Sequence, residues 1–142
     1  MNERYIRQTM IPEIGEAGQE KLKNAKVLIV GIGGLGSPIS LYLTAAGVGQ
    51  IGLIDDDIVS KSNLQRQILY TEAEIGQSKV ECACRRLSAL NSSTRFETYP
   101  NRFTPDNANR LVSAYDIIVD GCDNAATRYL IDDVCSRFKK PY

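Results

Sequence analysis

The chain has 142 residues, enough for one domain with its own hydrophobic core and short for two domains of ordinary size. Its 17 basic and 17 acidic residues cancel, so bulk charge does not favour binding to nucleic acid or to an anionic membrane. No apolar run approaches the roughly 20 residues that span a bilayer, and residues 1–10 lack a signal peptide's apolar stretch, so the expected compartment is the cytoplasm.

The residue types also restrict the chemistry. The sequence contains no histidine, which excludes Ser-His and Cys-His nucleophile pairs. None of the four cysteines has Cys-x-x-Cys spacing, and Cys82 and Cys84 lie two apart on a predicted helix, where side chains point about 200° apart. We therefore expect reduced structural thiols rather than a zinc site in this segment.

Strands and helices are predicted to alternate along the chain. Residues 11–25 read as a turn followed by a polar amphipathic helix, and residues 26–31, KVLIVG, as an apolar strand typical of a buried parallel sheet. The further predicted elements are helices at 37–49, 76–91, 104–115 and 124–140, strands at 50–56, 94–100 and 116–123, and the first residues of another strand at 141–142. This order predicts an α/β fold with a Rossmann-like, doubly wound, mostly parallel sheet and helices on both faces.

A glycine-rich loop connects the first strand to the helix that follows it. Gly31, Gly33 and Gly36 fit the pattern G-x-G-x-x-G, and Gly34 is an additional glycine. Glycines allow the backbone to approach phosphates, and the helix N-terminus supplies free N–H groups. Asp55 ends the next strand 19 residues after Gly36, where a carboxylate can accept hydrogen bonds from ribose hydroxyls. These features predict a nucleotide site but leave NAD and ATP both open.

The segment DDDIVSKSNLQRQ, residues 55–67, adds cationic and amide side chains beside this loop. Asn63, Gln65, Arg66 and Gln67 follow the second strand, and Lys79 begins the next predicted helix. When an α-phosphate is attacked and pyrophosphate leaves, negative charge grows on the β- and γ-phosphates, and fixed cations, commonly with Mg²⁺, stabilise it. Spacing alone leaves a solvated polar loop as an equal alternative.

Five motifs together resemble one family. They are RYIRQ (4–8), VLIVGIGGLGSP (27–38), AAGVGQIGLIDDDIVSKSNLQRQILY (45–70), GQSKVE (76–81) and DGCDNAATRYLID (120–132). In this order they resemble the ThiF/MoeB/HesA family, the bacterial relatives of ubiquitin-activating enzymes. The resemblance implies an adenylyltransferase that activates the C-terminal glycine carboxylate of a small ubiquitin-like sulfur-carrier protein, as in thiamin or molybdopterin biosynthesis, and releases pyrophosphate. It also implies an N-terminal arm and helix at 1–24 and an ATP-binding domain at 25–142.

The resemblance implies roles for individual residues. Gly34 would contact the nucleotide through its backbone, within a loop formed by Gly31, Gly33, Gly34 and Gly36, and Asp55 would hold the ribose. The nucleotide-binding loop would comprise Ser62, Asn63, Leu64, Gln65, Arg66 and Gln67, with Asn63 and Arg66 directed at phosphates.

The same resemblance assigns the remaining site residues. Lys79 would bridge the phosphates, Asp57 would line the site, Asp123 would accompany Mg²⁺, and Asn124 would lie against the nucleotide. Arg7 would reach the γ-phosphate of the neighbouring subunit's ATP, which implies a homodimer.

Full-length relatives are longer, and many carry a zinc site of two Cys-x-x-Cys pairs that this sequence lacks. We therefore expect the chain to be the nucleotide-binding part of a longer protein, with zinc only in that parent chain. A natural short protein that binds nucleotide but lacks the carrier-docking half stays open as the alternative. Two further alternatives stay open: an NAD-dependent oxidoreductase domain, whose reaction does not require the cation of SNLQR, and a non-catalytic nucleotide-binding scaffold subunit. The identity of the carrier or peptide, any later thioester or persulfide step, and the activity and dimerisation of this chain alone also stay open.

Other polar and aromatic residues receive structural interpretations. Cys122 is expected to be a structural thiol after a buried strand, and Asp56 is expected to face solvent. Arg128 and Asp132, spaced four apart, suggest an intrahelical ion pair. Packing roles are expected for Tyr5 and Tyr70.

Overall fold

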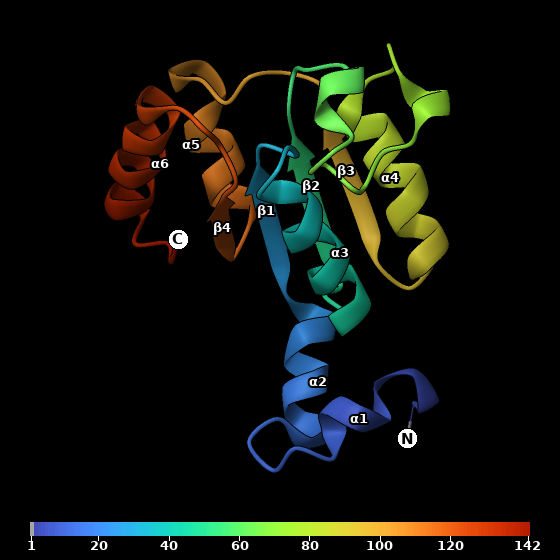
Figure 1. Ribbon diagram of the computed structural model, residues 1–142. Coiled ribbons are helices and arrows are strands. Elements are labelled where there is room, and N and C mark those ends of the chain that lie inside the picture. Colours follow the sequence, from blue (N-terminus) through green and yellow to red (C-terminus); the bar gives the residue numbers. More distant parts are fainter. Residues whose placement is uncertain (1) are drawn as a thin grey trace.

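A four-stranded parallel sheet forms the centre of the molecule, which is described here over residues 2–142 by a computed structural model (Figure 1). The strands are β1 (Lys26–Val30), β2 (Gln50–Ile54), β3 (Arg95–Tyr99) and β4 (Ile117–Asp120). Their order in the sheet is β3-β2-β1-β4, and every neighbouring pair is parallel. Since β2 and β3 lie to one side of β1 and β4 to the other, the chain reverses its direction of travel across the sheet, which confirms the doubly wound prediction.

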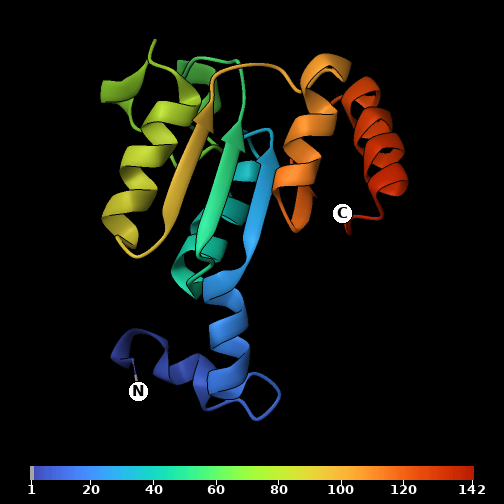
Figure 2. The same ribbon diagram turned by 180° about the vertical axis from the view of Figure 1, so that it is seen from behind.

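Helices connect the strands and cover both faces of the sheet. They are α1 (Ile6–Thr9), α2 (Gly15–Asn24), α3 (Gly36–Ala46), α4 (Lys79–Leu90), α5 (Pro105–Ala114) and α6 (Ala125–Phe138), with short 3-10 helices at Glu3–Tyr5, Lys61–Asn63 and Glu72–Glu74. Helices α3 and α4 lie on one face, and α5 and α6 lie on the other (Figures 1 and 2). In the part of the chain that the structure describes, none of these helices has the length and apolar character needed to cross a membrane.

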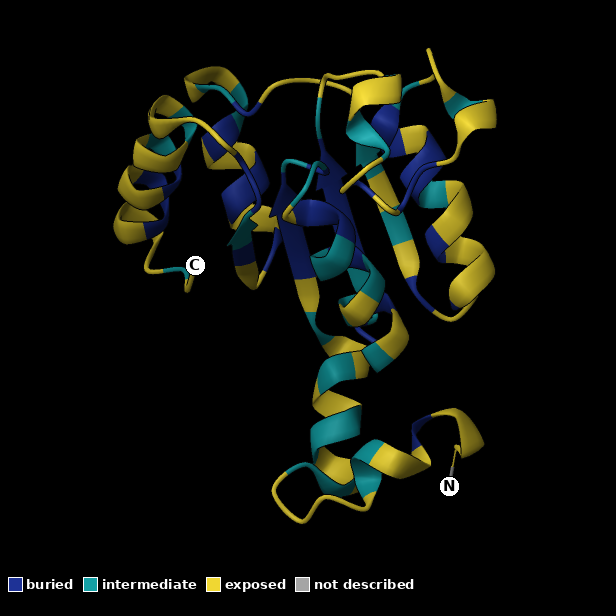
Figure 3. Ribbon diagram, viewed as in Figure 1, coloured by how far each residue is buried: buried dark blue, intermediate teal, exposed yellow. Residues whose placement is uncertain are grey.

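Two hydrophobic clusters follow from the alternation of side chains along the strands. On the face of α3 and α4, Ile29 and Leu53 pack in one cluster with Val80 and Leu87 of α4. On the opposite face, strand residues of β1, β2 and β4 pack with α5 and α6; this second cluster includes Leu28, Val30, Ile54, Ile118, Leu111, Val112 and Ile131. Strands β1 and β2 are therefore buried along most of their length (Figure 3), as the apolar run KVLIVG predicted for β1, whereas β3 at the edge of the sheet has no buried residue and β4 has one.

Helix boundaries follow local signals, with one correction. Gly47 ends α3 in the left-handed conformation at φ 91°, and Asn124 begins α6 by accepting a hydrogen bond from the Thr127 N–H at 2.9 Å. The helix expected over 76–91 begins instead at Lys79. Gly76 has φ 90°, a left-handed conformation that cannot continue a right-handed helix, so the residues before Lys79 form a turn.

The N-terminal segment lies beyond the amino ends of the strands (Figure 1). Tyr5 is buried there, and its hydroxyl accepts a hydrogen bond from the Asn91 amide at 2.8 Å. Gln8 and Gln19 both donate to the carbonyl of Ala46 at the end of α3, at 3.1 and 3.0 Å. These bonds join the arm and α2 to the α3 side of the sheet.

The last two residues lie beside β4. The carbonyl of Pro141 accepts a hydrogen bond from the Ile118 N–H at 3.1 Å, on the edge of β4 that β1 does not occupy. Residues 141–142 have no strand assignment, but this bond gives Pro141 the position expected for the beginning of a further strand.

Candidate nucleotide site

The carboxyl ends of the parallel strands collect most of the predicted site residues. The glycine loop follows β1, residues 55–78 follow β2, and the turn at 121–124 follows β4 (Figure 1). Parallel strands end at one edge of a sheet, so these segments converge although up to about 90 residues separate them in the sequence.

The glycine loop folds closely on itself and against the β4–α6 turn. Gly31 has φ 89°, and a Cβ atom at this position would lie 2.9 Å from the carbonyl oxygen of Gly121. A Cβ atom at Gly36 would overlap the carbonyl oxygen of Gly31. Side chains at 31 and 36 are therefore excluded by backbone packing, and the loop lies directly beside the turn that carries Asp123.

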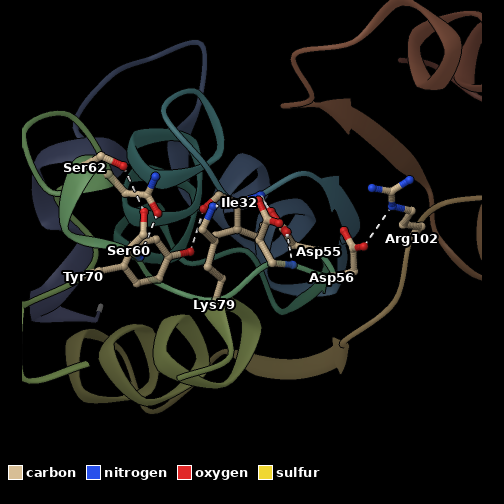
Figure 4. A network of polar contacts seen from close by, with 10 residues as sticks. Ile32, Asp55, Asp56, Ser60, Ser62, Tyr70, Lys79 and Arg102 are labelled. Carbon is tan, nitrogen blue, oxygen red and sulfur yellow. Dashed lines mark hydrogen bonds and ion pairs between the residues drawn. The ribbon is translucent and has the colours of Figure 1, made fainter. Parts of the chain in front are cut away.

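Asp55 holds the backbone of the glycine loop through a hydrogen bond. Its Oδ2 accepts a hydrogen bond from the Ile32 N–H at 2.8 Å, and its Oδ1 accepts one from the Asp57 N–H, also at 2.8 Å (Figure 4). Each carboxylate oxygen can accept more than one hydrogen bond, so Asp55 keeps acceptor capacity for a ribose hydroxyl. The predicted ribose residue thus also organises the backbone around it.

Tyr70 holds the same part of the loop through a hydrogen bond that sequence reasoning missed. Its hydroxyl donates to the carbonyl of Ile32 at 2.6 Å (Figure 4), while its ring packs in the cluster beside α3 and α4. Burial, reinforced by the nearby Asp55 carboxylate, raises the pKa of Tyr70 well above its ordinary value. The hydroxyl therefore stays protonated and acts as a donor. The packing expected for the Tyr70 ring is present, and the hydrogen bond of its hydroxyl to Ile32 is an additional role.

The loop SNLQRQ lies against the middle of the glycine loop. The Arg66 side chain passes Gly34, where a Cβ atom would lie 3.6 Å from its Cδ, and the Gln67 amide lies against Gly33, with the corresponding distance 3.3 Å. Arg66 also donates to the carbonyl of Ser62 at 3.1 Å. The structure thus brings the predicted cation next to the glycine backbone.

Other residues of this loop shape it. Asn63 accepts a hydrogen bond from the Ser60 N–H at 3.0 Å through Oδ1, so its Nδ2 group is the part left to reach a phosphate. The Ser62 hydroxyl contacts that of Ser60 at 3.1 Å (Figure 4). Leu64 packs half-buried against the hydrophobic cluster and anchors the loop, whereas Gln65 is exposed.

Lys79 forms an ion pair with Asp57. The Lys79 Nζ lies 3.2 Å from Asp57 Oδ2, and the two side chains are 4% and 69% exposed, respectively. The backbone N–H of Lys79 donates to the carbonyl of Asp57 at 3.0 Å. This second contact positions the start of α4 against the segment that follows β2. Lys79 and Asp57 therefore lie at the same edge of the sheet.

Asp56 is exposed, as expected, but it is not free. Its Oδ2 lies 2.9 Å from Arg102 Nε in the segment that follows β3 (Figure 4). The 46-residue separation gives no local sequence signal for this pair.

Carboxylates at this edge differ in whether they have a partner. Oxygens of Asp55, Asp56 and Asp57 lie within 4.8 Å of one another, but each carboxylate already contacts a backbone N–H or a cation. Asp123 is exposed and makes no hydrogen bond or ion pair with any other residue in the range 2–142. Carboxylate oxygens are the ligands that Mg²⁺ prefers, so Asp123 is the carboxylate here most open to one.

The β4–α6 turn is held by a contact that corrects an expectation. Arg128 does not pair with Asp132; its Nε lies 3.1 Å from Asp120 Oδ2, and it also donates to the carbonyl of Cys122 at 3.0 Å. The guanidinium reaches back across the first turn of α6, where two acceptors fit its fork geometry. The Cys122 thiol is buried and donates to Asp120 Oδ1 at 2.7 Å, and burial raises its pKa.

Arg7 is the predicted site residue that does not join the others. It is exposed on α1, beyond the amino ends of the strands and therefore at the opposite end of the sheet from the glycine loop (Figure 1). Within one chain it cannot complete the site.

A glycine loop between β1 and α3, a carboxylate at the end of β2 and cations beside the loop define a nucleotide-binding domain of the doubly wound α/β class. The chain belongs to the ThiF family, whose family model matches residues 5–142.

Relatives and solved structures agree with this assignment. The chain is 48% identical over 139 residues to the sulfur carrier protein adenylyltransferase of Thermus thermophilus, with 98% of this chain and 51% of the relative covered. It is 52% identical over 138 residues to adenylyltransferase and sulfurtransferase MOCS3 of Culex quinquefasciatus, with 97% and 32% covered. It superposes with a TM-score of 0.92 and 30% identity on E. coli tRNA N6-threonylcarbamoyladenosine dehydratase in complex with ATP, covering 98% of this chain and 57% of that one.

The chain therefore spans about half the length of the first relative and about a third of the second.

Proposed function

We propose that this chain is the ATP-binding part of an adenylyltransferase that activates a carboxylate as an acyl-adenylate. The observation that carries the proposal is the packing of Arg66 and Gln67 against Gly33 and Gly34, because it places a cation beside the backbone expected to hold phosphates. Hydride transfer from NAD develops no additional negative charge on phosphates that such a cation would stabilise.

The proposed substrate is the C-terminal glycine carboxylate of a small ubiquitin-like sulfur-carrier protein. Support comes from the relatives, which are named for adenylyl transfer and, in the Thermus thermophilus protein, for a sulfur carrier as the acceptor. A terminal carboxylate is ionised at neutral pH, so the reaction requires no general base of unusual pKa. The protein's task is to hold two anions together against their repulsion.

In the proposed step, a carboxylate oxygen forms a bond to the α-phosphorus. The bond from that phosphorus to the oxygen bridging to the β-phosphate breaks, and pyrophosphate leaves with its electron pair. Arg66 and Lys79 would stabilise the charge that grows on the departing phosphates, Asp55 would hold the ribose, and the glycine-loop amides would hold the triphosphate. Lys79 would exchange its contact with Asp57 for a phosphate oxygen.

Magnesium and a second copy of the chain complete the proposal. Mg²⁺ would screen the β- and γ-phosphates, and the unpartnered Asp123 carboxylate fits a role in holding it. A homodimer would allow Arg7 to reach the neighbouring copy's γ-phosphate. Since α1 lies at the far end of the sheet from the glycine loop, Arg7 could take this role only from another chain.

Pyrophosphate exchange tests the proposal directly. With Mg-ATP and a sulfur-carrier protein ending in glycine, we expect exchange of labelled pyrophosphate into ATP, and Arg66→Ala should lower it by about 100-fold or more while the fold stays intact. Arg95→Ala is the matched control, because Arg95 is also exposed and makes one side-chain hydrogen bond, to Gln50 at 2.6 Å near the amino ends of the strands. Near-native exchange in Arg66→Ala, or tight NAD binding without ATP binding, would contradict the proposal.

A further inference from the structure

The peptide unit between Ile32 and Gly33 is held by a residue from a distant part of the chain. The Tyr70 hydroxyl donates to the Ile32 carbonyl at 2.6 Å across 38 residues of sequence, and this contact is buried. The preceding peptide unit is held separately, because Asp55 accepts a hydrogen bond from the Ile32 N–H at 2.8 Å. Two consecutive peptide planes of the glycine loop thus have fixed partners outside the loop.

The Tyr70 bond determines where the Gly33 N–H points. In a planar trans peptide the carbonyl of one residue and the N–H of the next point in opposite directions. The Ile32 carbonyl points to Tyr70, whose ring is buried in the cluster beside α3 and α4. The Gly33 N–H therefore points away from this core, and it makes no hydrogen bond within the described range 2–142.

Without this bond the peptide plane would have little to hold it. Gly33 is followed by Gly34, and glycine adopts a wide range of φ values at low cost, so the 32–33 peptide could rotate and turn its N–H inward. A loop that binds phosphates through backbone N–H groups loses a donor when one plane rotates. A fixed partner for the carbonyl prevents that rotation.

Tyr70 also belongs to the segment that carries Arg66. Its N–H donates to the Gln67 carbonyl at 3.2 Å, and the Gln67 N–H donates to the Asn63 carbonyl at 2.8 Å. Tyr70 therefore connects the segment of Arg66 to the glycine loop, since its N–H bonds to Gln67 and its hydroxyl bonds to Ile32.

We propose that Tyr70 is a positioning residue: its hydroxyl holds the 32–33 peptide so that the Gly33 N–H faces the phosphates of a bound nucleotide, in register with Arg66. This inference rests on the proposed function, since it requires ATP to bind at the glycine loop. It assigns to Tyr70 a role in binding phosphates rather than in binding the nucleoside.

Comparison of ATP with adenosine separates these roles. We expect Tyr70→Phe, which keeps the ring, to weaken ATP binding about tenfold in calorimetric titration and to leave adenosine binding within about twofold. Tyr115→Phe is the matched control, because Tyr115 is also buried and its hydroxyl bonds to that of Tyr99 at 2.9 Å on the opposite face of the sheet. It should change neither affinity.

A second measurement follows the Gly33 amide itself, and its wild-type part does not depend on a variant folding. In ¹⁵N–¹H spectra, ATP should shift the Gly33 amide strongly in the wild-type chain and much less in Tyr70→Phe. An unshifted Gly33 amide in the wild-type chain with ATP bound would overturn the inference, as would equal losses of ATP and adenosine affinity in Tyr70→Phe. If the wild-type chain bound adenosine but not ATP, or bound neither, the proposed function itself would fail.

Discussion

At the residue scale, an ion pair within the chain neutralises the charge of Lys79 before any nucleotide binds. The side chain is almost fully buried, and Asp57 supplies the opposite charge at 3.2 Å. A buried ammonium without a partner is costly, so the free protein depends on Asp57. In the proposed complex a phosphate oxygen would take over this role, which makes the pair a local link between stability and nucleotide binding.

This link predicts a particular behaviour of Asp57→Asn. The variant should lose about 1–3 kcal/mol of unfolding free energy without nucleotide, because Lys79 then lacks an anionic partner. Saturating Mg-ATP should restore most of the loss, so the ATP-induced rise in Tm, measured by scanning calorimetry, should be larger than in the wild type. Asp56→Asn, which breaks the exposed pair with Arg102, should change Tm little. Equal ATP-induced shifts in both variants would count against the exchange of partners.

At the element scale, the β4–α6 turn depends on one arginine. Arg128 contacts both the Asp120 carboxylate at the end of β4 and the Cys122 carbonyl within the turn. It thereby fixes the turn that carries Asp123, although it contacts neither the glycine loop nor that carboxylate. The spacing of Arg128 and Asp132 on one helix suggested a local pair instead, because a sequence pattern shows neighbours on a helix but not the strand end packed beside it.

We expect Arg128→Lys to destabilise the chain by about 1 kcal/mol, since a single ammonium cannot satisfy both acceptors. Urea unfolding should show the loss as a lower midpoint. Arg137→Lys on the same helix affects only the exposed pair with Asp133, so its unfolding free energy should stay within about 0.5 kcal/mol of the wild type and its midpoint should change little. Indistinguishable midpoints for the two variants would show that the fork contact contributes little.

At the scale of the whole molecule, buried weak acids predict a loss of stability at alkaline pH. Burial raises the pKa of the Cys82, Cys122 and Cys135 thiols and of the Tyr70 and Tyr115 hydroxyls. The unfolded chain releases these protons from about pH 8.5 for cysteine and about pH 10 for tyrosine, whereas the folded chain retains them. Their contribution to stability is therefore complete below pH 8.5 and is lost as the pH rises toward the higher folded values.

Urea unfolding at pH 7.5, 9 and 10.5 under reducing conditions measures this loss. The unfolding free energy should fall at each step, and Tyr115→Phe should reduce the fall between pH 9 and 10.5, because one group that titrates only in the unfolded chain is removed. A free energy that stays constant over this range would contradict the assignment of these groups as buried and neutral.

Features that depend on residues close in the sequence were predictable. The apolar run KVLIVG and the strand–helix alternation led to the correct fold class, and the glycine pattern at 31–36 with Asp55 predicted a nucleotide site at the edge of the sheet where these residues lie. The family resemblance, which the matched family model confirms, supplied the preference for ATP that the glycine pattern alone left open.

Only the tertiary structure decided which side chains meet across long separations. Tyr70 on the Ile32 carbonyl, Arg102 on Asp56 and Arg128 on Asp120 all depend on how the loops after different strands pack at a common edge. Periodicity and spacing describe the surroundings of a residue over a few turns of chain, so they specify elements and their order. The direction of the Gly33 N–H and the partner of each charge are set by contacts between segments, and these exist only once the sheet has brought its carboxyl ends together.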